Sequence, residues 1–169
     1  MSNRMIKSAT RKNSLQLTDC LSSLFMLELA LPSQQFYLFS PWISDVALVD
    51  NRFGQVRSIA PNLEERQLPL STLLNAMAFR GTAVYIVCRP SYERTEAFLR
   101  KLSADIQVRQ VETLHEKGLI GDHFYLRGSM NFTYSGIHIN DEHIELTTDT
   151  EQVARALLEA RHRWETLGK

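Results

Sequence analysis

The amino-acid sequence predicts an α/β domain built on a mixed β-sheet with helices on both faces. Stretches in which apolar residues recur at helical spacing alternate along the chain with short apolar stretches typical of strands. No internal repeat or low-complexity tract interrupts this order. The chain has 169 residues, of which 44% are apolar, so it can bury one sizeable core and leaves little room for a second domain.

The first predicted elements are an arm and a helix. Residues 1–13 are mostly polar and basic, and we expect a loosely ordered, flexible arm there, followed by a single domain over 14–169. Apolar residues recur at helical spacing over 14–31, which predicts an amphipathic helix that ends at the proline that follows. Basic residues precede the apolar run 21–31, as in a secretory signal peptide, but Glu28 interrupts the run and no small-residue cleavage site follows.

The middle and C-terminal parts of the chain alternate strands with helices. Residues 34–45 are rich in aromatic side chains and predict a buried strand that runs into a loop at Ser40, and the loop is expected to stay irregular through 51–69. Further helices, each with one apolar side, are expected over residues 70–80, 92–105 and 150–167. Further strands are expected over residues 82–88, 106–113 and 138–149. Asp149 or Thr150 is placed to cap the last helix.

The segment 113–133 concentrates polar side chains on a predicted hairpin. β-Favouring residues lie on either side of Gly121 and Asp122, which are placed to turn one strand into the next. Side chains two positions apart share one face of a strand. His115 and Lys117 are therefore expected to lie together on one surface.

Hydrogen-bonding residues follow the second strand of this hairpin. Gly128 allows a close approach of the backbone to a ligand, and Ser129 and Asn131 supply donors. An imidazole that reacts near neutral pH, an ammonium for a non-bridging oxygen and donors around a pentavalent phosphorus suit the cleavage of a phosphodiester. No carboxylate cluster or Cys/His spacing suggests a metal, and we expect metal-free chemistry without a cofactor.

The same residues also have ordinary structural interpretations. A lone histidine on a strand is usually a surface or half-buried residue, and the company of Lys117, Ser129 and Asn131 is what favours a catalytic His115. A turn alone explains Asp122. The other histidines lack such company, and we expect them to be structural or surface residues.

The pattern His115-x-Lys117-x4-Asp122, followed by Gly-Ser-x-Asn at 128–131, resembles the HKD signature of the phospholipase D superfamily. The order of the predicted elements also resembles a single-HKD domain of that superfamily over nearly the whole chain. The spacing from Asp122 to the glycine is one residue shorter than in the family, which shortens the hairpin. The resemblance gives Asp122 a structural or histidine-supporting role, and Glu142 occupies the place of an acidic residue that bonds the catalytic imidazole.

The resemblance implies an active site that two copies of the chain complete. Superfamily members with two motifs use both, and single-motif members resemble the Nuc-type nucleases, which dimerise. One His115 would attack phosphorus to give a phosphohistidine, while its mate would protonate the leaving oxygen and then activate water. Lys117 and Asn131 of both chains would bind the non-bridging oxygens, with assistance from Ser129.

These features lead us to expect a homodimeric, metal-independent phosphodiesterase that acts on nucleic acid. We expect a DNA endonuclease, with DNA favoured over RNA as the substrate. Small single-motif members resemble nucleases, and the sequence offers no apolar loop suited to enter a membrane. Within the superfamily the chain is most similar to stand-alone bacterial proteins of the DpdK type, which implies antiviral defence and restriction-system subunits as partners. Two alternatives remain: a phospholipid phosphodiesterase, and a non-catalytic subunit that holds a DNA phosphate in a restriction complex.

Charge and cysteine content bear on partners and compartment. Lys plus Arg equals Asp plus Glu at 19 each, so any affinity for phosphate has to be local. Cys20 and Cys88 fit neither a metal site nor a disulfide framework, and reduced thiols suit a cytoplasmic protein. No apolar run reaches membrane-spanning length.

Trp42 and several arginines have two interpretations each. An aromatic ring beside a site can stack on a base, but we expect Trp42 to be a core residue that closes the strand end. Five arginines are equally compatible with a nucleic-acid path and with ordinary solvated side chains: Arg52, Arg57, Arg66, Arg89 and Arg94.

Overall fold

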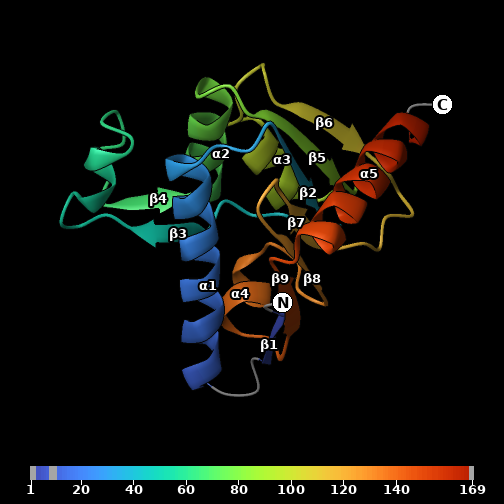
Figure 1. Ribbon diagram of the computed structural model, residues 1–169, viewed down its shortest axis with the longest axis horizontal. Helices are drawn as coiled ribbons and strands as arrows, with labels where there is room; N and C mark the ends of the chain where they lie inside the picture. Colours follow the sequence, from blue (N-terminus) through green and yellow to red (C-terminus); the bar gives the residue numbers. More distant parts are fainter. Residues whose placement is uncertain (1–2, 8–10, 168–169) are drawn as a thin grey trace.

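The computed structural model describes residues 3–7 and 11–167, which fold around a seven-stranded sheet of order β1-β9-β8-β7-β2-β5-β6 (Figure 1). The strands are β1 (Asn3–Lys7), β2 (Gln35–Phe39), β3 (Ala47–Asp50), β4 (Gln67–Pro69), β5 (Ala83–Cys88), β6 (Gln107–Gln110), β7 (Gly118–Ile120), β8 (Tyr125–Gly128) and β9 (His143–Thr147). The helices are α1 (Arg11–Ala30), α2 (Leu70–Phe79), α3 (Glu93–Leu99), α4 (Tyr134–His138) and α5 (Thr150–Thr166).

The sheet is mixed. β2 pairs parallel with β5, and β5 pairs parallel with β6. On the other side of β2, the strands β7, β8, β9 and β1 follow in antiparallel pairs. This arrangement confirms the α/β fold class and the mixed sheet that the sequence predicts.

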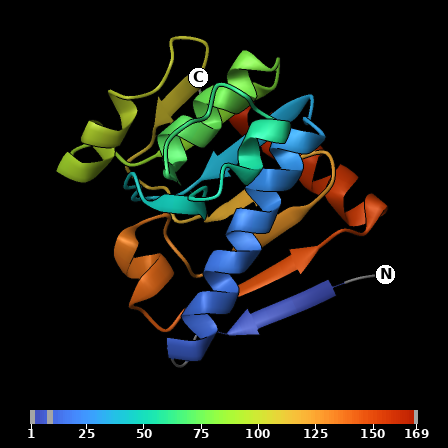
Figure 2. The ribbon, with the colours of Figure 1, turned by 90° about the vertical axis from the view of Figure 1, so that its left-hand side faces the viewer.

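Helices cover both faces of the sheet. Side chains of successive strand residues point to opposite sides, so a strand made of apolar residues has an apolar surface on each face. In β2, Phe36 and Leu38 join a large core with buried residues of α1, α2 and α3. Tyr37 and Phe39 join a second, smaller core with residues of α5, including Trp164. Figure 2 shows α1 in front of the sheet and α5 behind it.

Four of the five helices lie where the sequence predicts them, although α3 ends at Leu99 and does not reach residue 105. The sequence did not predict α4, whose last residue falls within the expected strand 138–149. Gly81 ends α2 by taking a positive φ of 96°, a conformation that glycine adopts without strain. Asp149 caps α5, and its carboxylate accepts a hydrogen bond from the Gln152 amide at 3.2 Å.

The apolar run 21–31 belongs to the folded domain. All but its last residue lies within α1, where Leu21, Phe25 and Leu29 are buried in the core. Burial of this side of α1 against the sheet accounts for the apolar residues that a signal peptide would also show. No helix in residues 3–7 or 11–167 is long and apolar enough to cross a membrane.

Two segments are more ordered than the sequence predicts. Asn3–Lys7 forms β1 in place of the expected loose arm, and its backbone pairs antiparallel with β9. Residues 1–2 and 8–10 of that arm lie outside the described part of the chain. Within the expected loop 51–69, β4 pairs with β3 as a separate two-stranded sheet.

The side chain of Asn51 organises the segment between β3 and β4. Its amide nitrogen donates to the carbonyl oxygens of Leu63 and Glu65 at 3.1 and 3.0 Å, and its amide oxygen accepts from the Val56 amide at 3.1 Å. Asn51 is only 3% exposed. A buried side chain thus satisfies backbone groups that sequence periodicity does not report, which explains why the sequence predicts a loop here.

Both cysteines carry free thiols, as expected. Cys88 lies in the core, where burial raises the pKa of its thiol to about 12. Burial also raises the pKa of the half-buried Cys20. Because the thiolate is the reactive form, both groups are poor nucleophiles at neutral pH.

A buried polar network ties the end of α1 to the turn between β7 and β8. Ser33 Oγ donates to the Glu28 carboxylate at 2.8 Å and accepts from the Asp122 amide at 2.8 Å. The Asp122 carboxylate accepts from the Gln34 amide at 2.6 Å. Glu28 is fully buried, and burial raises the pKa of its carboxyl group. A side chain at Gly121 would place its Cβ 2.5 Å from Glu28 Oε1 and 2.8 Å from Ser33 Oγ, so it would displace the side chains of this network.

Removing the Ser33 hydroxyl should destabilise the fold. Ser33→Ala leaves the buried Glu28 carboxyl group and the Asp122 amide each without one partner, so we expect a loss of about 1–3 kcal/mol in the free energy of unfolding. Urea unfolding measures this loss. Ser58→Ala is the matched control, because that hydroxyl makes a single exposed hydrogen bond to the Gln55 carbonyl. Equal losses in the two variants would contradict a structural role of the network.

Candidate active site

The predicted catalytic residues other than Asp122 gather at one edge of the sheet, where β2 and β8 end and β7 and β9 begin. Gly118 pairs with Phe39 on β2 and with Arg127 on β8. Gly128 pairs with Ile144 on β9. The residues just beyond these pairs therefore share one edge, and they include Ser40, Lys117, Ser129 and Glu142.

His115 and Lys117 lie immediately before β7, not on a strand as the sequence predicts. The expected alternation nevertheless holds, because Leu114 is buried against the α5 side and Glu116 pairs with Arg163 of α5 at 2.9 Å. His115 is exposed and Lys117 is half-buried, with Lys117 Nζ 2.8 Å from the His115 carbonyl oxygen. Among the described residues, nothing bonds to the His115 imidazole, which is thus available to a substrate.

Glu116 shows how the segment is held from its other side. Burial raises the pKa of the Glu116 carboxyl group, and the Arg163 guanidinium partly offsets that rise. The ion pair fastens the segment to α5 while leaving the neighbouring side chains directed elsewhere. Two consecutive residues thus supply the reactive imidazole, from His115, and the ion pair to α5, from Glu116.

Ser129 is fixed by β9. Its amide donates to the His143 carbonyl at 3.0 Å, and its hydroxyl accepts from the His143 amide at 3.1 Å. The same hydroxyl donates a short hydrogen bond to the Glu142 carboxylate. Gly128 makes this approach possible, because a Cβ there would lie 2.0 Å from the His143 carbonyl oxygen.

Sequence reasoning missed a buried polar residue that lies next to Asn131. Ser40 Oγ lies 3.5 Å from Asn131 Oδ1, donates to the Trp42 carbonyl at 2.8 Å and accepts from the Phe132 amide at 3.1 Å. Ser40 is fully buried and joins the end of β2 to the segment after β8. The sequence signal that could have identified Ser40 is its position as a polar residue at the carboxyl end of a buried strand, where site residues of open sheets gather.

Neither of the two predicted carboxylates is bonded to the His115 imidazole within the described part of the chain. Glu142 accepts hydrogen bonds from Ser129 and, at 3.3 Å, from Asn140, and the described chain contains no hydrogen bond between Glu142 and the His115 imidazole. Asp122 follows β7, whereas His115 precedes it, so the two residues are at opposite edges of the sheet. Asp122 holds the turn to the segment before β2, which fits the structural half of its expected role.

Trp42 is not a core residue, contrary to the expectation. The residue follows β2, and its side chain is 41% exposed at the site edge. The Arg89 guanidinium lies over the ring, 5.6 Å from its centroid, and Arg89 Nε donates to the Leu114 carbonyl at 2.7 Å. Arg89 is thus the arginine, of the five considered, that contacts the residue preceding His115.

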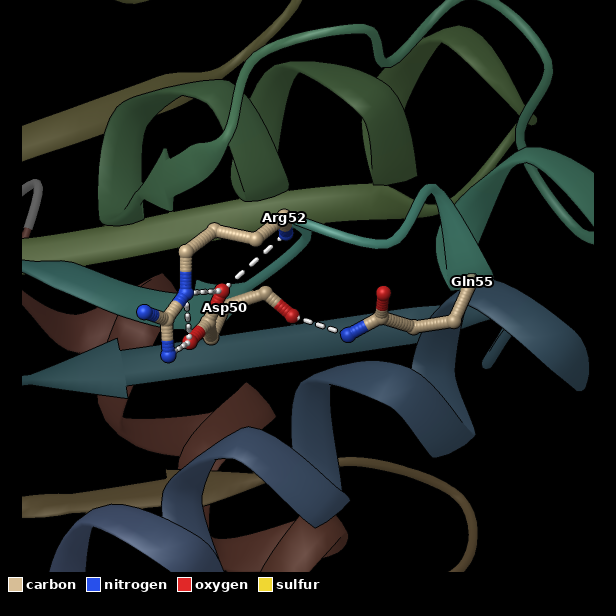
Figure 3. A network of polar contacts seen from close by, with 3 residues as sticks. All are labelled: Asp50, Arg52 and Gln55. Carbon is tan, nitrogen blue, oxygen red and sulfur yellow. Dashed lines mark hydrogen bonds and ion pairs between the residues drawn. The ribbon is translucent and has the colours of Figure 1, made fainter.

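Arg52 is engaged elsewhere. Figure 3 shows its guanidinium against the Asp50 carboxylate, with an Nη2 to Oδ2 distance of 2.6 Å, while Gln55 donates to the Asp50 carbonyl. This ion pair lowers the pKa of Asp50 and raises that of Arg52. Both residues belong to the region of the two-stranded sheet, not to the site edge.

Within residues 3–7 and 11–167, no three or more His, Cys, Asp or Glu side chains cluster in a way that could hold a metal ion. The polar groups that lie at this edge are an imidazole, an ammonium, a carboxamide and a hydroxyl that donates its proton to Glu142. Such a set binds anionic oxygens by charge and hydrogen bonds.

Comparisons with known proteins support the fold and identify the family. The family model described as "Cardiolipin synthase, PLD-like domain" matches residues 55–164, which include the segment from His115 to Asn131. No curated protein matches the chain.

Solved structures share the fold over nearly the whole chain. NucT from Helicobacter pylori is 16% identical with a TM-score of 0.62, and the alignment covers 97% of this chain and 96% of NucT. Nuc from Salmonella typhimurium, a phospholipase D family member, is 17% identical with a TM-score of 0.63 over 97% of this chain and 94% of Nuc. TrmBL2, an archaeal chromatin protein, is 13% identical with a TM-score of 0.52, covering 98% of this chain and 53% of TrmBL2.

Adding a methyl group at Gly128 should disrupt this edge. In Gly128→Ala the Cβ meets backbone atoms of His143 and Ile144, so β8 and β9 must separate, and we expect a loss of about 1–3 kcal/mol in unfolding free energy. Urea unfolding tests this. Gly81→Ala provides the comparison, because its Cβ would have nothing within 4 Å and only its positive φ would cost energy. A Gly128→Ala protein as stable as the unchanged protein would contradict the steric requirement.

Proposed function

Because the chain belongs to the PLD-like domain family of the phospholipase D superfamily, we propose that it is a metal-independent phosphodiesterase, and specifically a DNA endonuclease that works as a homodimer. The observation that carries this proposal is the exposed His115, whose imidazole has no partner among residues 3–7 and 11–167, at a sheet edge shared with Lys117, Ser129 and Asn131. A nucleophile beside donors for phosphoryl oxygens is the arrangement that phosphodiester cleavage requires.

The proposed first step is attack of a neutral imidazole nitrogen of His115 on phosphorus. A nitrogen–phosphorus bond forms, the bond from phosphorus to the leaving oxygen breaks, and the partner's His115 gives that oxygen a proton. In the second step the partner's His115, now neutral, takes a proton from water as the water oxygen attacks phosphorus and releases the imidazole. The products are a phosphate monoester and an alcohol, and both histidines return to their starting protonation states.

The donors have separate tasks in this scheme. Lys117 and Asn131 bind the non-bridging oxygens, whose charge grows in the pentavalent transition state. Ser129 assists, and the Glu142 carboxylate orients its hydroxyl. The chain supplies one histidine of the required pair, so a second copy has to complete the site.

DNA is favoured as substrate by the sequence resemblance to the Nuc-type nucleases and by the exposed Trp42 and Arg89 at the edge. A specific observation supports a second candidate, phospholipid phosphodiesterase, because the matching family model is described as cardiolipin synthase. The narrower assignment to a DpdK-type protein of a restriction system, with other subunits as partners, rests on the sequence resemblance alone. A non-catalytic phosphate-binding subunit is disfavoured by the accessible imidazole.

Cleavage of DNA in the presence of EDTA tests the proposed function. Labelled single-stranded and double-stranded DNA should be cut, and His115→Ala should slow cutting by on the order of 10³-fold or more, because both the nucleophile and the acid are lost. His162→Ala is the matched control, since His162 is exposed on α5 and should leave the rate unchanged.

Two results would overturn the proposal. Hydrolysis of short-chain phospholipids with DNA and RNA left intact in EDTA would establish the lipid alternative. Undiminished DNA cutting by His115→Ala would remove His115 from the chemistry.

A further inference from the structure

We propose that Trp42 is a base-stacking residue that positions an unpaired nucleobase next to the scissile phosphate. This inference rests on the proposed function and names the part of the substrate, beyond its phosphate, that the site recognises. It starts from the placement of this residue at the site edge: Trp42 is 41% exposed, whereas the other tryptophan, Trp164, is buried at 8% exposure. A large aromatic side chain left in solvent beside a site is available for contact with a ligand.

The backbone around Trp42 is rigid on both sides. Ser40 Oγ donates to the Trp42 carbonyl at 2.8 Å, and the next residue, Ile43, exchanges two hydrogen bonds with the Thr95 hydroxyl at 2.9 and 3.0 Å. Ser40 and Thr95 are both fully buried. A ring carried by a fixed backbone loses little conformational freedom when a base stacks on it.

One guanidinium connects the indole to the catalytic segment. Arg89 lies over the Trp42 ring, and its Nε donates to the carbonyl oxygen of Leu114, the residue before His115. Tyr92 contributes a second ring at 6.3 Å between centroids, tilted by 56°. The indole therefore belongs to the same local assembly as His115, and Arg89 adds positive charge to it.

The chemistry of this assembly matches a nucleotide. The phosphate fits the donors around His115, and the base fits an aromatic face with a neighbouring guanidinium. Stacking is open only to a base whose face is exposed, so Trp42 should favour single-stranded or unpaired DNA over a closed duplex. Every base has such a face, so the contact should show little sequence preference.

Binding of the full chain carrying His115→Ala to an oligothymidylate and to an abasic deoxyribose-phosphate strand of the same length tests the proposal without turnover. Trp42→Ala should weaken oligothymidylate binding about tenfold, and Trp42→Phe should restore most of it, because one stacked base contributes roughly that factor. Binding of the abasic strand should be the same in all these variants. Oligothymidylate should also quench indole fluorescence, and this quenching should disappear in Trp42→Phe, which retains Trp164.

Phe53→Ala serves as the control, because Phe53 is 90% exposed on the loop after β3 and should bind oligothymidylate normally. Equal weakening of both strands by Trp42→Ala, or a change in solution mass in place of base-dependent binding, would overturn the stacking role. DNA cutting tests the proposed function separately. If Trp42 contributes to binding of the oligothymidylate but not of the abasic strand, and the protein cuts no DNA, only the catalytic proposal is contradicted.

Discussion

The pairing of the short strand β7 between β2 and β8 is the constraint on which the site depends. β7 is buried along its length, and its register with both neighbours decides which residues reach which edge of the sheet. Gly118 makes the fit possible, because a Cβ there would lie 2.6 Å from the Leu126 carbonyl oxygen. A slip by one residue would exchange the faces of His115 and Glu116, so that the ion pair with α5 and the exposed imidazole would both be lost.

β7 also separates the reactive residues of the motif from the residue that supports the fold. Before the strand lie the imidazole and the ammonium, and after it lies Asp122, which ties the turn to α1 and β2 through Ser33 and Gln34. The motif is thus one continuous stretch in sequence but has two ends with different tasks in space. Support at one end leaves the other end free to present reactive groups on a rigid element. Trp42 and Arg89 extend the reactive end toward what we infer is the base of the substrate.

Much of this arrangement was predictable because local patterns and tertiary packing agree. Helical periodicity, the stop at Gly81 and the Asp149 cap located α1, α2, α3 and α5, and the alternation around His115 located the reactive face. The short helix α4 was not predicted. The misses have physical causes. The Asn51 side chain and the pairing of β1 with β9 order two segments through hydrogen bonds that periodicity does not encode. The residue type of Trp42 favours the core, yet the residue lies beyond the end of β2 at the site edge, where it is 41% exposed.

The central claim is that each chain carries half of an active site. Mixed dimers of the unchanged chain and His115→Ala measure this directly, through the rate of EDTA-resistant DNA cutting after the two chains are exchanged in equal amounts. If both histidines act at one phosphate, only dimers of two unchanged chains are active, and about one quarter of the full rate remains. A remaining rate of about one half would mean that each chain works alone, which contradicts the shared site.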